Sequence, residues 1–336
     1  MLEKPDLQDE KITACLQAEY GLEIIEVEFL PLGADRDTAV YRVVAKDGNL
    51  YFLKLRSGAF DEVSVELPKY LSSQGIEQII APVAAKSGLA WSRLDSYTAI
   101  LYPFIEGRNA YQVVLTDRQW IVFGAALKRI HTITVPAALK TRIPQEHFSS
   151  FWRNKVTSFL KNSDPETDGD IVAIKVAELL KNRQAEISHL IERADRYARM
   201  LQAQTLQLVL CHSDLHAGNI FIGANGGFYF VDWDNPILAP KERDLMFPGG
   251  AQGFSGHTPQ EEESLFFKGY GKAQIDPTAL SYYRYERIIQ DIAVYCEQLL
   301  LSTGGGEDRE QSLRYLMSNF LPNNTIDIAY RSDKTS

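Results

Sequence analysis

The sequence predicts an α+β protein with two lobes, a small β-rich N-terminal lobe over residues 1–103 and a larger helical C-terminal lobe over residues 104–336. Short β-rich runs fill most of the first hundred residues, whereas long helical patterns fill most of the remainder, and strands segregated from helices are typical of the α+β class. The length of 336 residues is sufficient for two lobes. We expect the junction between them at about residues 102–107.

The first lobe begins with an amphipathic helix over residues 7–20, where apolar side chains recur at helical spacing. The runs typical of strands are 22–31, 38–46, 50–56, 78–84, 88–93 and 97–104. Turn sequences rich in Gly, Pro, Asp and Asn separate the first three of these runs. A second helix is expected over residues 61–73, although Pro68 disfavours a continuous helix through residues 64–68.

The second lobe is predicted to be mainly helical, with one β-rich island over residues 206–232. The expected helices are 115–133, 146–162, 170–204, 260–272 and 277–301. The third of these is long because neither Gly nor Pro occurs between Ile171 and Ala217. The strands of the first lobe, this island and the helices around it together define the predicted fold class.

Composition and charge exclude several classes of function. The formal net charge of -9 argues against nucleic acid or an anionic membrane as the main partner, since both attract basic surfaces. The three cysteines, Cys15, Cys211 and Cys296, are far apart and form no C-x-x-C motif, which suits a reducing compartment. No run approaches the roughly 18 apolar residues of a membrane span, and the polar N-terminus does not resemble a signal peptide. We therefore expect a cytoplasmic location.

The β-rich island contains a predicted hairpin with polar residues at its open end. Apolar runs at 220–222 and 228–231 flank the turn sequence of residues 223–227. Asn219 and Asp232 stand symmetrically on either side, so antiparallel pairing is expected to bring them together. Their amide and carboxylate oxygens are ligands that Mg²⁺ prefers, with substrate phosphates and water in the remaining positions.

Asp214 lies in the loop that leads into this hairpin, five residues before Asn219. A carboxylate at this place can orient an attacking hydroxyl and accept its proton. The spacing His212-x-Asp214-x-x-x-x-Asn219 has the form of a kinase catalytic loop. His212 is expected to shape the loop through a hydrogen bond to the backbone. A zinc site formed by Cys211, His212 and His216 is an alternative on residue type alone.

These motifs resemble those of the aminoglycoside phosphotransferase family, whose fold is similar to that of protein kinases. The resemblance is carried by the stretches 101–105, 211–219, 231–234, 238–247 and 281–288, and it extends over nearly the whole chain. It implies a bilobal protein-kinase-like fold. It also implies an enzyme that uses ATP and Mg²⁺ to phosphorylate a hydroxyl of a small molecule.

Lys54, in the apolar run 51–55, is the candidate for binding the ATP phosphates. By itself it reads as an exposed lysine on a strand, but the family pattern places a phosphate-binding lysine in this third strand. Such a lysine pairs with a glutamate of the following helix. Glu62 and Glu66 are both candidates, because they are four residues apart and share a helix face. Glu62 is the preferred partner and Glu66 is the alternative.

The remaining contacts to the nucleotide are expected around the loop after the first strand and at the lobe junction. The loop contains Gly33 and Asp35 and would cover the phosphates, although it lacks the G-x-G-x-x-G pattern of protein kinases. Backbone groups of Phe104 and Ile105 would bind adenine. No G-x-x-x-x-G-K-[ST] motif occurs, so a Walker-type site is unsupported.

Three further features bear on the acceptor and on the loop. Asp234, beside the proposed metal ligands, could bind a cationic amine or could be a solvated turn residue. Asp244 could brace the catalytic loop or cap a helix. The aromatic run Tyr282, Tyr283 and Tyr285 is interpreted as core packing.

The resemblance implies an aminocyclitol such as spectinomycin as the acceptor. An endogenous amino-alcohol, similar to choline or homoserine, is the main alternative. A non-catalytic nucleotide-binding module is a third, and the joint presence of Lys54, Asp214, Asn219 and Asp232 argues against it.

Overall fold

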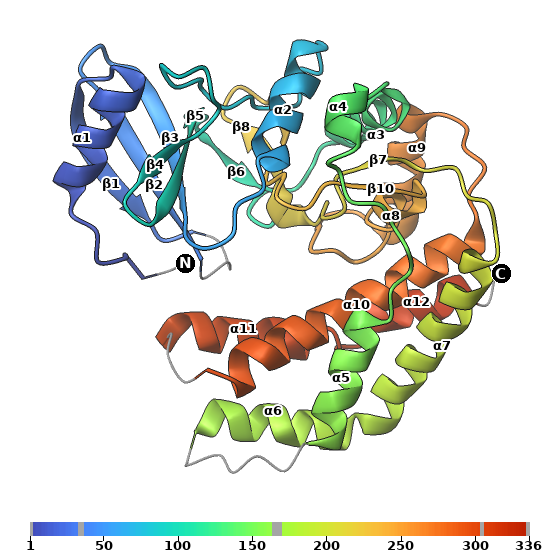
Figure 1. Cartoon of the computed structure of the whole chain (residues 1–336). Helices are drawn as coiled ribbons and strands as arrows, with labels where there is room; N and C mark the ends of the chain where they lie inside the picture. The colour runs from blue at the N-terminus through green and yellow to red at the C-terminus, as the bar shows by residue number, and fades with distance from the viewer. Residues whose placement is uncertain (1–2, 33–36, 163–169, 303–305, 334–336) are drawn as a thin grey trace.

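The computed structural model describes residues 3–32, 37–162, 170–302 and 306–333. A β-rich part lies at one end of the molecule and a larger helical part at the other (Figure 1). This arrangement confirms the predicted α+β class. Among the described residues, none of the helices combines the length and the apolar character needed to cross a lipid bilayer.

The β-rich part is an antiparallel sheet of five strands in the order β1-β2-β3-β5-β4. The strands are β1 (Ile24–Leu30), β2 (Thr38–Ala45), β3 (Leu50–Arg56), β4 (Ser92–Leu94) and β5 (Tyr97–Pro103). Helix α1 (Asp9–Tyr20) packs against β1 and β4. Its buried Ile12 and Leu16 join the apolar cluster on this side of the sheet. The first three predicted strands and the first helix are therefore confirmed.

Three details of the first lobe differ from prediction. The run 78–84 forms no strand, because Ile79 pairs with Phe230 in a single bridge only. The strand expected at 88–93 is the short β4 instead. Helix α2 (Val63–Ser73) continues through Pro68, which we had expected to interrupt it. The proline lacks one helical N–H, but its buried ring gains apolar packing that offsets the loss.

The second part contains the predicted helices and several unpredicted ones. The helices are α3 (Asp117–Thr132), α4 (Ala137–Lys140), α5 (Phe151–Lys161), α6 (Ile171–Asn182), α7 (Gln184–Gln202), α8 (Glu242–Leu245), α9 (Pro259–Tyr270), α10 (Pro277–Leu300), α11 (Gly306–Ser318) and α12 (Thr325–Asp333). The long helix expected over 170–204 is divided at Arg183, whose φ of -108° and ψ of 10° are not helical. Helices α4, α8, α11 and α12 were not predicted.

Two small ladders form the β-rich island. Strand β6 (Gly107–Asn109) pairs with β8 (Ile220–Gly223), which pairs with β9 (Phe228–Phe230). Strand β7 (Val209–Cys211) pairs with β10 (Ile237–Ala239). The predicted hairpin is thus confirmed, whereas β6 and β10 are additions that short, mixed sequences did not reveal.

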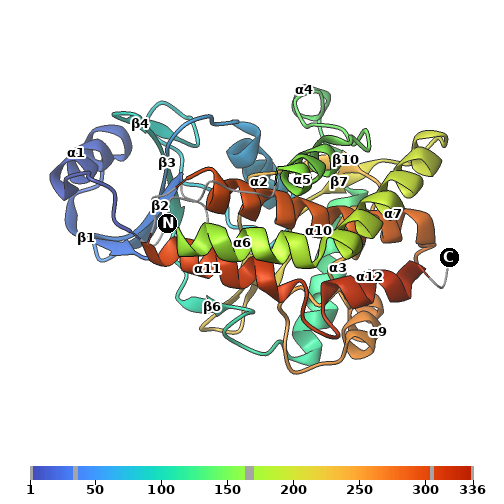
Figure 2. The same cartoon turned by 90° about the horizontal axis from the view of Figure 1, so that it is seen from below.

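Helix α10 is the centre of the helical layer that includes α5, α6, α7, α11 and α12 (Figures 1 and 2). Tyr282, Tyr283 and Tyr285 are buried on it, as predicted.

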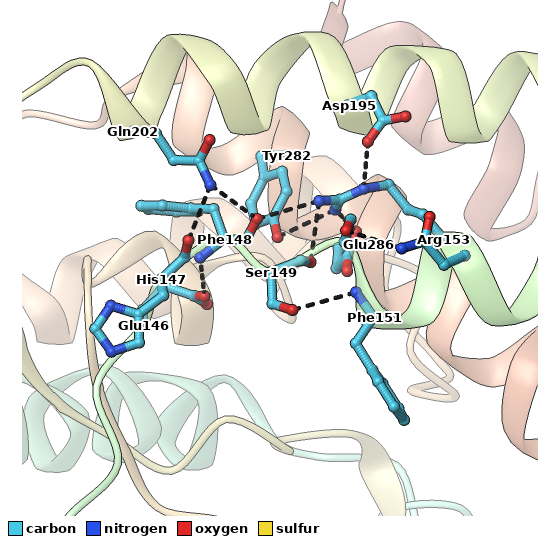
Figure 3. Close-up of polar contacts among 12 residues, drawn as sticks. Glu146, His147, Phe148, Ser149, Phe151, Arg153, Asp195, Gln202, Tyr282 and Glu286 are labelled. Atoms are coloured by element: carbon cyan, nitrogen blue, oxygen red, sulfur yellow. Dashed lines mark hydrogen bonds and ion pairs between the residues drawn. The ribbon is translucent and has the colours of Figure 1, made fainter.

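A buried arginine ties this layer together. Arg153 of α5 forms ion pairs with Glu286 of α10 and, at 2.6 Å between Nε and Oδ1, with Asp195 of α7 (Figure 3). Its guanidinium also donates to the carbonyls of Phe148 and Ser149, at 3.1 and 3.0 Å. Three helices therefore share one charged network.

Candidate active site

The hairpin register places Asn219 one residue away from the predicted position. Ile220 lies opposite Phe230, so Asn219 faces Val231, whose N–H donates to the Asn219 carbonyl at 3.0 Å. The expected direct pairing of Asn219 with Asp232 is therefore wrong by one residue. Asp232 comes after the paired strand and has a φ of +64°, so the chain turns at that residue.

Asp214 is held by groups from two parts of the chain. Its Oδ1 lies 2.5 Å from a guanidinium nitrogen of Arg287 on α10. The Asn219 side-chain amide donates to the Asp214 carbonyl at 2.8 Å and lies 3.4 Å from Oδ2. Burial opposes ionisation of Asp214, but Arg287, and then His216 and His212, outweigh it, so the pKa of this carboxyl is lowered. Asp214 is therefore an anion at neutral pH.

The catalytic loop is braced from behind by Asp244 of α8. This fully buried carboxylate accepts hydrogen bonds from the N–H groups of His212, at 2.9 Å, and Ser213, at 2.7 Å. His131 approaches the same carboxylate through Nε2 at 3.1 Å. Ser213 needs this support because its φ is +72°, a conformation that side chains other than glycine rarely adopt. The predicted bracing role of Asp244 is confirmed.

His212 has the structural role expected of it. Its Nε2 donates to the Val231 carbonyl at 3.0 Å, and its Nδ1 accepts from the Asp214 N–H at 3.3 Å. The ring thereby connects the loop to the hairpin. Both ring nitrogens are used, so His212 is no longer a free metal ligand.

The zinc alternative is not supported by the positions of its other two members. The Cys211 thiol faces the carbonyls of Ala239 and Pro240 and lies near His131 and Asp244. His216 instead accepts from the Gly218 N–H and stacks on Tyr111. Cys211 and His216 therefore belong to different surroundings.

Lys54 of β3 lies between two carboxylates at the end of the hairpin. Its Nζ is 2.9 Å from Asp232 Oδ1 and 2.9 Å from Asp234 Oδ2. Burial would lower the pKa of Lys54, but the two aspartates outweigh it and raise that pKa. Burial likewise opposes ionisation of Asp232, and Lys54 outweighs it, so the pKa of Asp232 lies far below its usual value. The group is a fixed arrangement of charges from both lobes.

The expected partners of Lys54 have a different role. Glu62 and Glu66 both form ion pairs with Arg142, which follows α4. Helix α2 packs its apolar face on the helical part, and its carboxylates reach Arg142 from there. The pairing of Lys54 with Glu62 is therefore wrong for this state of the protein.

Asp234 was also misjudged. Its carboxylate pairs with Lys54 and, at 2.7 Å, with Arg56, and its side chain is only 16% exposed. It is thus not a solvated turn residue, and the cations that it contacts here belong to β3, while its binding of a cationic acceptor stays a prediction.

At the lobe junction, one of the backbone groups near the expected adenine position is already hydrogen-bonded within the protein. The Phe104 N–H already donates to the Leu50 carbonyl at 3.0 Å, extending the sheet by one bond. This N–H is therefore already used within the sheet. The Phe104 carbonyl and the backbone of Ile105 stay candidates. Gly33 and Asp35 lie outside the described residues, so their predicted role stays a prediction.

Asn219 and Asp232 suit a magnesium ion by the chemistry of their donors. The Asn219 amide nitrogen faces Asp214, so the oxygen Oδ1 remains as its acceptor. Asp232 uses Oδ1 toward Lys54 and retains Oδ2. Two hard oxygen donors, with phosphates and water completing the shell, match the preference of Mg²⁺.

Arg287 and Arg56 are contacts that the sequence argument missed. Arg287 lies 73 residues after Asp214, and no local motif connects them. Arg56 follows Lys54 at the spacing that places both on one face of β3, which was the only available signal.

An aspartate in a loop of catalytic-loop form, two oxygen donors after it and a largely buried lysine from a separate sheet match the parts of an ATP-dependent kinase of the protein-kinase-like fold. The chain belongs to the phosphotransferase enzyme family, whose model matches residues 28–245.

The chain is also similar to individual proteins of known name. The crystal structure of spectinomycin phosphotransferase APH(9)-Ia with ADP and spectinomycin is 34% identical, has a TM-score of 0.91, and is matched over 98% of this chain and 100% of that one. Amicoumacin kinase hAmiN, at 17% identity and a TM-score of 0.60, covers 99% of this chain and 98% of its own and shares the fold. Protein StrN of Streptomyces griseus is 26% identical over 231 residues, which is 66% of this chain and 69% of that protein.

Proposed function

We propose that this enzyme transfers the γ-phosphate of ATP to a hydroxyl of spectinomycin or a closely related aminocyclitol. The supporting observation is the 34% identity to spectinomycin phosphotransferase over 98% of this chain. The catalytic loop alone could not support it, because choline kinase LicA has the same fold at 14% identity. The substrate assignment therefore depends on the similarity of the entire helical part.

At the nucleotide end, Lys54 binds the ATP phosphates. Asn219 and Asp232 hold Mg²⁺, which supplies charge neutralisation at the phosphoryl group. Since Lys54 contacts Asp232 and Asp234 before any nucleotide binds, the phosphates must share the lysine with these carboxylates. Arg56 provides a second cation for Asp234 and so keeps that carboxylate paired.

At the acceptor end, Asp214 orients the attacking hydroxyl and accepts its proton late in the reaction. Arg287 favours the ionised form that this role requires. Phosphoryl transfer demands little covalent work from the protein, so positioning and electrostatics are expected to supply most of the rate enhancement.

A panel of acceptors tests the proposal. Purified enzyme with Mg²⁺ and ATP is offered spectinomycin, other aminocyclitols and aminoglycosides, choline, ethanolamine and homoserine. ADP release and the mass of the product are measured. We expect the highest kcat/KM with spectinomycin or a near relative. Preference for choline or homoserine would identify a metabolite kinase instead, and no ATP consumption with any acceptor would contradict catalysis itself.

The same assay tests the role of Asp214. Asp214→Asn should lower kcat by about 10²–10⁴-fold, the range of general acid–base contributions. The Kd for ATP should change little, because Asp214 does not belong to the charged group of Lys54, Arg56, Asp232 and Asp234, called here the Lys54 group. Asp117→Asn is the matched control on a side chain that is 75% exposed, and it should leave kcat unchanged. Normal turnover by Asp214→Asn would refute the assignment.

A further inference from the structure

Arg287 bridges two carboxylates beside the catalytic loop. One guanidinium nitrogen lies 2.5 Å from Asp214 Oδ1, and Nε lies 3.0 Å from Asp291 Oδ1, one helical turn further along α10. The Arg287 side chain is 17% exposed. The rigid fork of a guanidinium can serve two partners at once, whereas a lysine is a single point charge. Arg287 therefore lies between Asp214 and Asp291.

Some contacts of Asp214 hold its backbone, and others hold its carboxylate. Bonds within the loop hold its backbone, through the His212 ring and the Asn219 amide. Its carboxylate oxygen Oδ2 accepts a hydrogen bond from the Asn219 amide at 3.4 Å and lies 3.7 Å from His216 Nε2. Among the described residues, Arg287 makes the shortest contact to this carboxylate and binds the other oxygen, Oδ1. The direction of the carboxylate is thus set largely from α10.

Helix α10 is itself firmly placed at this turn. Glu286, the preceding residue, is buried and forms the ion pair with Arg153 (Figure 3). Successive residues of a helix point about 100° apart, so Glu286 and Arg287 face different sides. One turn of α10 therefore connects the helical layer to the catalytic loop.

We propose that Arg287 is a positioning residue, which holds the Asp214 carboxylate in the direction needed for the acceptor hydroxyl, with Asp291 as its anchor. The inference rests on the proposed role of Asp214. In this role Arg287 itself transfers no proton.

Replacement of Arg287 tests this inference. Arg287→Gln should lower kcat by about 10²-fold, the effect of a misplacement near 1 Å. Arg287→Lys keeps the charge and is the variant to use if the glutamine variant fails to fold; it should recover part of the loss. The KM for ATP should stay within twofold of wild type, because the Lys54 group is separate.

The matched control is Arg284→Gln, one turn earlier on α10. Arg284 is also largely buried, but it contacts Glu263 and Ser332 instead of the catalytic loop. Its loss should disturb the helix equally while leaving kcat within about threefold. Added guanidinium should restore turnover to Arg287→Ala and not to Arg284→Ala.

The outcomes separate this inference from the proposed function. An inactive wild-type enzyme would contradict the function, whereas an active one with unchanged kcat in Arg287→Gln would overturn the inference. Equal losses in the Arg284 and Arg287 variants, or no rescue by guanidinium, would also overturn it. A double-mutant cycle of Arg287→Gln and Asp214→Asn in thermal midpoint needs no turnover. Non-additive shifts are expected, and additive shifts would remove the contact on which the inference depends.

Discussion

Carboxylates in this protein differ in charge state because their neighbours differ. Asp214 and Asp232 lie beside cations, which lower their pKa values. Glu262 of α9 is buried, and among the described residues it accepts a hydrogen bond from the Gly249 N–H, at 2.9 Å, instead of pairing with a lysine or arginine. Burial therefore dominates and raises the pKa of Glu262 to about 7.

This carboxyl should make stability depend on pH. The ordinary pKa of glutamic acid is 4.5, so between about pH 4.5 and 7 the native state binds more protons than the unfolded state at Glu262. Stability from this group is present below pH 4.5 and is lost as the pH rises to 7. Glu262→Gln cannot titrate but can still accept from Gly249. Its thermal midpoint, relative to wild type, should rise across this range.

Glu261→Gln is the matched control, with the opposite sign. The hydrogen bonds of Glu261 to Thr258 lower its pKa, so its contribution is present above pH 4.5 and is lost below it. Thermal melts from pH 4 to pH 8 would compare both variants with wild type. Parallel curves for Glu262→Gln and wild type would contradict a titrating Glu262.

At the scale of elements, helices α3 and α9 approach closely through two glycines. A Cβ placed on Gly124 would lie 2.0 Å from the Phe266 carbonyl oxygen, and one on Gly269 would lie 1.8 Å from the Ile121 carbonyl oxygen. The obstacle is backbone in both cases, so no side-chain rotation can relieve it. This packing places His131, near the end of α3, beside Asp244.

Gly124→Ala should therefore destabilise the protein. Alanine gains about 1 kcal/mol of helix propensity over glycine. Overpacking typically costs about 1–3 kcal/mol, and the backbone contact favours the upper end. Ala125→Ser, at the exposed neighbouring position, also adds one heavy atom and should have little effect. Urea unfolding measures both, and a Gly124→Ala protein as stable as wild type would show that the helices can separate freely.

At the scale of the whole molecule, the largest apolar core among the described residues does not end where the sequence changes character. The core of the helical part includes Val63, Leu67 and Leu71 of α2, although α2 lies within the first hundred residues. The bridge between Ile79 and Phe230 joins the same segment to the hairpin. The predicted lobe boundary at residue 103 marks a change in sequence pattern. Residues 63–79 precede it, but they pack against the helical part that follows it.

Leu67→Ala should consequently destabilise the helical part. Leu67 is fully buried, and Leu→Ala in a core typically costs about 2–5 kcal/mol. Leu89→Ala makes the same chemical change at a side chain that is 45% exposed, and it should cost much less. Tryptophan fluorescence in urea reports on the core through the buried Trp120. Equal stability losses in the two variants would contradict the shared core.

Much of the fold followed from local patterns. Alternation and turn residues predicted β1, β2 and β3, and helical periodicity predicted α3, α9 and α10. Short elements such as β6, β10 and α8 were missed, because three or four residues carry too little periodicity. The division of α6 from α7 was missed as well, since Arg183 has no breaker signal.

Spacing along the chain was enough to nominate the groups of the candidate site: an aspartate in a loop of catalytic-loop form, two hard oxygen donors around a hairpin, and a lysine in the third strand. These signals are local, because each depends on spacing along a few residues. The partners of these residues were set by the folded structure. It paired Lys54 with Asp232 and Asp234 instead of Glu62, and it brought Arg287 to Asp214. Contacts between distant elements follow from how apolar faces pack, which spacing along one chain does not encode.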